Sequence, residues 1–174
     1  MNQYIFDGRV WIVCGPDGKL IDDIDTDQIF HNAHLHITDI DEMGKHAFGN
    51  LEGWKDFPDK SQAGDILLVG KNFGAGSSRQ QAVDCFKALG IRLIIASSFG
   101  AIYKRNAINS GFPILILADE EAFVSAGRVR QMHTLKVDLQ AGRVSVVETG
   151  DTFQMSPFSK VQRDIFDKGT LLKI

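Results

Sequence analysis

The fold of this chain is organised around one glycine-rich stretch, Val69-Gly70-Lys71-Asn72-Phe73-Gly74-Ala75-Gly76-Ser77-Ser78-Arg79-Gln80. The apolar run before it, residues 65–69, is too short for a helix and predicts a buried strand. Residues 81–89 place their apolar side chains on one helical face and end at Gly90, a common C-terminal stop. The sequence therefore predicts a strand, a tight turn and a helix.

This turn is suited to an anion. Its glycines let the backbone approach a ligand closely, and Ser77 or Ser78 is expected to cap the following helix. The free N–H groups of the first helical turn favour a negative ligand, which the Arg79 guanidinium would meet. The Gly-Lys-Ser/Thr ending of a nucleotide P-loop is absent, and no histidine near Ser77 completes a serine-hydrolase triad. A plain structural turn with a solvent-facing Arg79 is the alternative.

Composition places the chain among globular proteins of one domain. It has 174 residues, of which 44% are hydrophobic and 24% charged, and we expect a single domain over residues 1–174. A net charge of -3 and a pI near 5.9 argue against nucleic-acid binding. No apolar run is long enough to span a membrane and the first residues do not resemble a signal peptide, so a cytoplasmic location without membrane contact is expected. Cys14 and Cys85 are predicted to be buried reduced thiols.

The rest of the pattern predicts an α/β domain with a mixed sheet. Residues 25–27 are expected to form a loop that displays its side chains, and residues 39–48 a short helix capped by Thr38 or Asp39. Two alternating runs separated by residues 140–143 predict a hairpin, and hence an antiparallel section beside a parallel one. The other predicted elements are strands at 4–13, 91–96 and 114–117, and helices at 97–111, 120–127 and 161–169, with Phe99, Ile102, Tyr103 and Ala107 on one side of the first of these helices.

The segment Gly74-Ala75-Gly76-Ser77-Ser78-Arg79 resembles the Gly-x-Gly-Ser-Ser-Arg signature of the small subunit, or swivel domain, of aconitase-family hydro-lyases. Three further matches follow the family order: Asp25-Thr26-Asp27-Gln28-Ile29, the Ser98-Phe99 start of a helix that carries Ile102 and Asn106, and Gly111-Phe112-Pro113-Ile114. The resemblance covers most of the first two-thirds of the chain. It implies a swivel-type β/β/α domain, and the length is that of a separate small subunit.

The resemblance also implies the chemistry, which is the dehydration or isomerisation of a 2-hydroxy di- or tricarboxylic acid. A 4Fe-4S cluster is expected on a separate large subunit, without which this chain would be inactive. Ser77 would be the alkoxide base, while Ser78 and Arg79 would bind a substrate carboxylate. Gly74, Gly76, Asp25 and Asp27 would support the loop. No metal is expected on this chain, because an open-site cluster needs about three cysteines and only two occur.

By the same resemblance, residues 30–60 are expected to include a flexible substrate-recognition loop, with His34 and His36 in contact with substrate. The loop reads His34-Leu35-His36-Ile37, and a histidine at its third position suits either an alkyl group or a carboxylate. Isopropylmalate is the leading substrate, ahead of homoaconitate-like tricarboxylates and 2,3-dimethylmalate. Zinc binding by the loop histidines is disfavoured, because their spacing matches no helical or finger pattern. A non-catalytic module that holds a phosphate or dicarboxylate is the alternative from another class.

Overall fold

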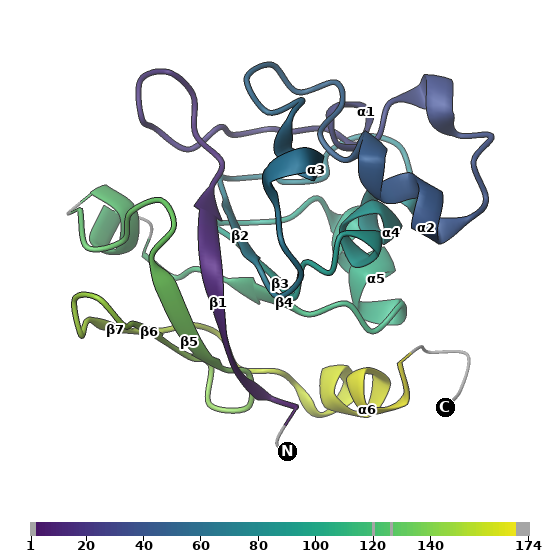
Figure 1. Ribbon diagram of the computed structural model, residues 1–174. Helices are drawn as coiled ribbons and strands as arrows, with labels where there is room; N and C mark the ends of the chain where they lie inside the picture. The colour runs from purple at the N-terminus through teal and green to yellow at the C-terminus, as the bar shows by residue number, and fades with distance from the viewer. Residues whose placement is uncertain (1–2, 120, 126, 170–174) are drawn as a thin grey trace.

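Strand β1 (Ile5–Ile12) joins the two halves of a seven-stranded sheet, whose strand order is β4-β3-β2-β1-β5-β6-β7. The computed structural model describes residues 3–119, 121–125 and 127–169 (Figure 1). On one side β1 pairs in parallel with β2, and on the other it pairs antiparallel with β5. The remaining strands have the bounds β2 (Ile66–Val69), β3 (Leu93–Ala96), β4 (Ile114–Ile116), β5 (Thr134–Asp138), β6 (Arg143–Val146) and β7 (Thr152–Gln154). The predicted α/β fold with a mixed sheet and an antiparallel hairpin is confirmed.

The parallel half is covered on both faces, as its continuous apolar strands predict. Leu67 and Ile94 belong to the core beneath α4 (Gln81–Ala88) and α5 (Ala101–Asn109). Their neighbours Leu68 and Ile95 belong to a second core, which is shared with the antiparallel strands. Figure 1 shows the resulting order of layers, with the helices on one side of β2 and β3 and strands β5 to β7 curling over the other. This is the expected β/β/α arrangement.

Between β1 and β2 the chain forms five short helical turns: α1 (Thr26–Ile29), η1 (Asn32–His34), α2 (Ile40–Met43), η2 (Gly44–His46) and α3 (Phe57–Lys60). Phe30, Phe48 and Phe57 are buried in the core under α4, which fixes this segment against the domain. The predicted short helix is present as α2, capped by Asp39 rather than Thr38 because the Asp39 carboxylate accepts from the Asp41 N–H at 3.0 Å. The proposed mobility of residues 30–60 stays a prediction.

The expectation of a loop over residues 25–27 was wrong, because Asp25 starts the helical turn α1. Its carboxylate accepts from the Gln28 N–H at 2.8 Å, and the Gln28 side chain accepts from the Asp25 N–H at 3.0 Å. This reciprocal capping box satisfies two otherwise unpaired donors and stabilises a turn of low intrinsic propensity. Asp25 is therefore engaged within its own turn, whereas Asp27 is left to interact with the rest of the site.

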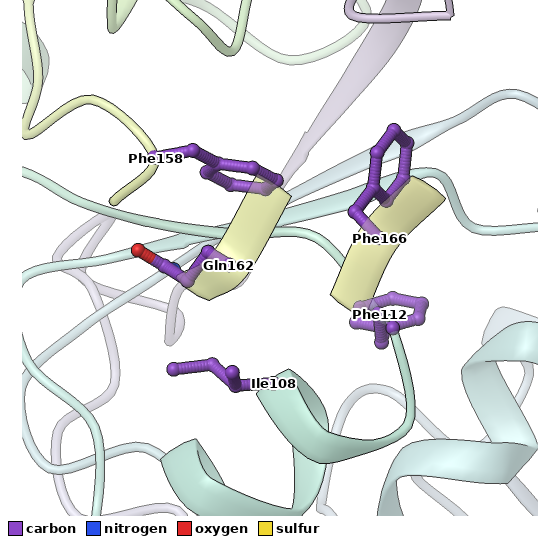
Figure 2. Close-up of a pocket in the computed structure, with 6 residues that line it drawn as sticks. Ile108, Phe112, Phe158, Gln162 and Phe166 are labelled. Carbon is purple, nitrogen blue, oxygen red and sulfur yellow. The ribbon is translucent and has the colours of Figure 1, made fainter. Parts of the chain in front are cut away.

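The C-terminal helix α6 (Lys160–Lys168) closes the domain, and it ends at Gly169 as predicted. It packs near the C-terminal end of α5, where a small pocket is lined by Ile108, Gly111, Phe112, Phe158, Gln162 and Phe166 (Figure 2). None of these lining residues is ionisable, so the pocket is a packing feature of the α5–α6 contact. The helix expected at 120–127 corresponds to the π-helical turn Glu121–Ser125, while residues 120 and 126 lie outside the described residues. In the described ranges, no helix has the length and apolar character needed to cross a membrane.

Candidate functional site

The glycine-rich loop leaves the C-terminal end of β2 and runs between two neighbouring segments. On one side the Gly74 N–H donates to the Ile24 carbonyl at 2.8 Å, and the Thr26 N–H donates to the Ala75 carbonyl at 2.9 Å. On the other side Phe73 forms a parallel bridge with Phe99. The carboxyl edge of parallel strands is the usual place for a ligand in α/β folds, and three segments that are distant in sequence meet there.

The glycines of the loop have separate structural roles. Gly74 has a φ of +79°, and a Cβ atom there would lie 2.2 Å from Cγ of Tyr103. Tyr103 is buried and donates its hydroxyl to the Ala82 carbonyl at 2.9 Å, so it cannot easily move aside. Gly76 has a φ of +94°, which favours glycine for the turn itself. Gly74 is required for close packing against Tyr103, and Gly76 for the backbone conformation of the turn.

Ser77 and Ser78 do not cap the following helix, contrary to the prediction. Helix α4 starts at Gln81 after the N-cap Gln80, which makes no side-chain capping bond. Arg79 and Gln80 lie between Ser78 and the first residue of the helix. Both serine side chains are exposed at the surface. Their hydroxyls are therefore not used to close the helix and can face a ligand.

The start of α5 was also predicted too early. Ser98 accepts from the Asn72 N–H through its hydroxyl at 2.8 Å and so belongs to the loop, while α5 starts at Ala101. Ile102 is 41% exposed rather than buried beside Tyr103. Tyr103 and Ala107, four positions apart, form the buried face of α5, and Ile102 lies outside that face.

Arg79 is held from within the domain and is not a solvent-facing side chain. Its Nη1 donates to Oδ1 of Asp27 and to the Phe30 carbonyl, both at 2.9 Å, and its side chain is 12% exposed. Asp27 also accepts from the Asn32 N–H at 2.9 Å and from the Asn50 amide at 3.0 Å. The hydrogen bond from Arg79 is the main reason that the pKa of Asp27 lies below its usual value. Asp27 thus fixes the position of the guanidinium.

The other side of the guanidinium faces the serine. Nη2 of Arg79 lies 3.3 Å from Oγ of Ser77, to which it donates. The Nε–H and the second N–H of Nη2 have no hydrogen-bond partner within the part of the chain that the structure describes. A guanidinium that is anchored through one nitrogen and has free donors on the other two can bind a carboxylate in a defined orientation.

Ser78 has a different neighbour. Its Oγ accepts from Nδ2 of Asn106 on α5 at 3.1 Å. Asn106 lies in the third of the four motif segments from which the family resemblance was inferred, and the motif alone did not distinguish a role in the site from a role in the fold. The structure places it against the loop.

The histidines of residues 30–60 separate into two environments. His34 is half-buried and stacks on His46 with ring centroids 3.8 Å apart and an interplanar angle of 23°. Burial, followed by the proximity of His34 and of Lys45, lowers the pKa of His46. His36 is exposed. The described residues contain no cluster of three or more His, Cys, Asp or Glu side chains that could hold a metal ion.

This histidine segment lies beside the anchored guanidinium. Phe30, whose carbonyl accepts from Arg79, also presents its ring to His34 and to His46 at centroid distances of 6.2 and 6.1 Å. The Gln81 amide donates to the Leu35 carbonyl at 3.4 Å and connects the segment to the start of α4. His34 is thus linked to Arg79 through Phe30, and His36 is exposed on the same segment.

Two residues of this environment were missed by the sequence argument. Asn50 and His46 reach Asp27 and His34 across 23 and 12 positions of the chain (50 − 27 and 46 − 34). Neither lies in a recognisable motif, and only folding brings them to the loop. The site thus contains the Ser77 hydroxyl beside the anchored Arg79 cation, and the Ser78 hydroxyl beside the Asn106 amide. The N–H groups of Arg79 without a partner in the described residues suit an anionic ligand.

This chain is similar to known proteins in sequence and in fold. Residues 28–120 match the model of the aconitase C-terminal domain family. The 3-isopropylmalate dehydratase small subunit of Caldicellulosiruptor bescii is 38% identical, over 91% of this chain and 92% of that protein. The small subunit of the same name from Aquifex aeolicus is 37% identical, over 98% and 94%. A crystal structure of 3-isopropylmalate dehydratase from Methanocaldococcus jannaschii superimposes with a TM-score of 0.81 at 32% identity, covering 97% of this chain and 92% of that one.

Proposed function

Because this chain belongs to the aconitase C-terminal domain family, we propose that it is the small subunit of a 3-isopropylmalate dehydratase. In this role it would convert 2-isopropylmalate to 3-isopropylmalate in leucine biosynthesis, together with a large subunit. The similarity to small subunits of that name extends over nearly the whole chain. The observation that carries the proposal is the Arg79 guanidinium, which Asp27 anchors and which donates to the Ser77 hydroxyl.

Ser77 is proposed as the base. In this role its alkoxide takes the proton bound to the substrate carbon, forming the O–H bond at Oγ while the C–H bond breaks. A serine alkoxide is costly unless its charge is stabilised. The Nη2–H of Arg79 is already directed at Oγ, and a hydrogen bond between a cation and an oxyanion is stronger than one between neutral groups.

Arg79 is proposed to bind a substrate carboxylate through its two nitrogens with free donors. Asp27 and the Phe30 carbonyl occupy Nη1 and prevent the guanidinium from turning away. Ser78 would donate its hydroxyl proton to the same carboxylate. A lysine in place of Arg79 could not keep one anchor, one serine contact and a carboxylate in fixed directions.

The cofactor is proposed to reside on the large subunit. A 4Fe-4S cluster there would act as a Lewis acid that helps the substrate hydroxide to leave. The residues of this chain do not fit such a group. Cys85 is fully buried in the core under the helices and burial raises the pKa of its thiol, while Cys14 packs against the other core. The proposed task of this chain is to supply the base and the carboxylate clamp.

Isopropylmalate is the proposed substrate, ahead of homoaconitate-like tricarboxylates and 2,3-dimethylmalate. The lowered pKa of His46 keeps its imidazole neutral at neutral pH, and this uncharged ring, which stacks on His34, favours an alkyl group over a second carboxylate. His36→Arg would add a permanent cation to the exposed part of the loop. We expect this substitution to shift the preference of the assembled enzyme from alkyl to carboxylate substituents. An unchanged preference on a substrate panel would argue against the loop assignment. The protein is proposed to act in the cytoplasm.

The test is reconstitution with a cluster-bearing large subunit, followed by an assay of isopropylmalate dehydration. Ser77→Ala should abolish turnover without disturbing the complex, because it removes one oxygen atom. Ser156→Ala is the matched control, since Ser156 is exposed on the surface. If Ser77→Ala retains substantial activity, Ser77 is not the base. If no complex forms and no 2-hydroxy acid is dehydrated, the non-catalytic anion-binding alternative is favoured.

A further inference from the structure

One face of helix α5 supports the site loop at two points. Tyr103 places its ring where a side chain at Gly74 would be. Asn106, three positions further along the helix, donates from Nδ2 to Oγ of Ser78 at 3.1 Å. Residues three apart lie on the same side of a helix, so α5 fixes both the start of the turn and the second serine.

The hydrogen bond from Asn106 determines what the Ser78 hydroxyl can do. A serine hydroxyl carries one proton and two acceptor lone pairs. Asn106 occupies a lone pair and leaves the proton of Ser78 available. The described part of the chain provides no acceptor for that proton, and the serine side chain is exposed. The Ser78 proton is therefore available for donation to a ligand.

The two adjacent serines consequently have opposite surroundings. Ser77 receives a hydrogen bond from a cation, Arg79, which favours its negatively charged form. Ser78 receives one from a neutral amide, which offers an oxyanion much less stabilisation. We propose that Asn106 is a positioning residue that keeps Ser78 a neutral donor directed at the substrate carboxylate, and so separates its role from that of Ser77. This inference rests on the proposed function.

A double-mutant cycle tests the inference on the assembled complex. If Asn106 acts through Ser78, Asn106→Ala should lower kcat/KM for isopropylmalate by about 5- to 30-fold, mainly through KM, as expected for one lost hydrogen bond to a bound anion. The same substitution in a Ser78→Ala background should change kcat/KM by less than about twofold. A general structural role would lower activity equally in both backgrounds, and that additive result would overturn the inference.

Two further variants keep the result interpretable. Asn106→Leu keeps nearly the same shape but removes the polar atoms. It should lower kcat/KM as much as Asn106→Ala does, which would show that the loss does not come from a cavity in the fold. Lys104→Ala alters an exposed residue of the same helix and should leave kcat/KM unchanged. Circular dichroism and gel filtration check the fold and the assembly of each variant.

Binding measurements separate this inference from the proposed function. The same cycle is run on the Kd of 2-isopropylmalate, measured by titration calorimetry with the complex. If the wild-type complex binds 2-isopropylmalate without turnover, the proposed function fails, and the cycle in Kd still decides the role of Asn106. If the wild-type complex binds no 2-isopropylmalate, the inference is overturned as well, because a donor directed at its carboxylate would have no ligand.

Discussion

Asp27→Asn is the substitution that examines the site most directly, because it removes a charge while keeping the size of the side chain. The Asp27 carboxylate accepts from Arg79, from the Asn32 N–H and from the Asn50 amide. An asparagine oxygen can still accept from Arg79 and Asn32. Its amide nitrogen would then face the Asn50 amide, and two donors would oppose each other.

The expected effect follows from these contacts. A hydrogen bond to a charged group contributes about 1.5–3 kcal/mol and a neutral one about 0.5–1.5, so the loss is about 1 kcal/mol. Asp27 is 36% exposed, and water therefore replaces part of the interaction. The larger effect is on the position of the Arg79 guanidinium. Without its anchor, the guanidinium no longer fixes the substrate carboxylate relative to the Ser77 hydroxyl. We expect kcat/KM to fall by about 10- to 100-fold, with a loss of unfolding free energy of only about 1 kcal/mol.

Steady-state kinetics on the assembled complex and urea unfolding of the isolated chain measure the two effects. Asp59→Asn, at an exposed acid of α3, is the matched control. The pKa of Asp27 is lowered in the folded state, so its contribution to stability is complete above the unfolded value of about 3.9. That contribution is lost as the pH falls through the lower, folded pKa, and the stability gap between wild type and variant should close there. If Asp27→Asn retains kcat/KM within about twofold of wild type, Asp27 does not orient Arg79.

Three further substitutions test the stability of the domain. Gly74→Ala should destabilise the chain by more than about 3 kcal/mol in thermal or urea unfolding, because its φ is +79° and the new Cβ would lie 2.2 Å from Cγ of Tyr103. Asp65→Asn should lower the free energy of unfolding by about 2–3 kcal/mol, since a carboxylate that is 2% exposed pairs with Arg9 at 2.8 Å. Burial raises the pKa of Asp65, but hydrogen bonds from Arg9 and other donors lower it overall, so the stabilisation should be present at neutral pH and disappear in acid. His46→Phe should reduce the loss of unfolding free energy between pH 7 and pH 5. Burial lowers the pKa of His46 in the folded state, so the neutral imidazole contributes fully to stability above the unfolded pKa of about 6.5, and this contribution is lost as the pH falls. Urea unfolding with an unchanged pH dependence would refute this.

The parts of the fold that the sequence predicted are those with local causes. Strands β2 and β3 are continuous apolar runs, and every residue in them is buried. Helix α6 ends at a glycine in the left-handed conformation, as its sequence indicates. The hairpin of β5 and β6 follows from alternation and turn chemistry. In each case the local preference and the tertiary environment favour the same structure.

The errors arose where a tertiary contact competed with a local one. Serines before a helix are usually read as caps, yet the hydroxyl of Ser78 accepts from Asn106 and that of Ser98 accepts from the Asn72 N–H. These partners lie 28 and 26 positions away. No local pattern could have revealed that they would take the hydroxyls from the helix ends. Helix α5 starts at Ala101 rather than at residue 97, whereas α4 starts at Gln81 as predicted.

The resemblance of the site motif implied which serine is the base and which binds the carboxylate, but it gave no physical reason for that division. In the sequence Ser77-Ser78, the two side chains are chemically identical, and nothing local distinguishes a base from a donor. The structure distinguishes them by what flanks the loop. The segment after β1 supplies Asp27, which directs the Arg79 cation at Ser77, and helix α5 supplies the Asn106 amide for Ser78. Each flanking contact can be removed without altering either serine. Loss of Asp27 should impair both the chemical step and carboxylate binding, because Arg79 serves both, whereas loss of Asn106 should impair carboxylate binding alone. A kinetic comparison in which Asn106→Ala lowered kcat as much as Asp27→Asn would show that the serines are not separated in this way.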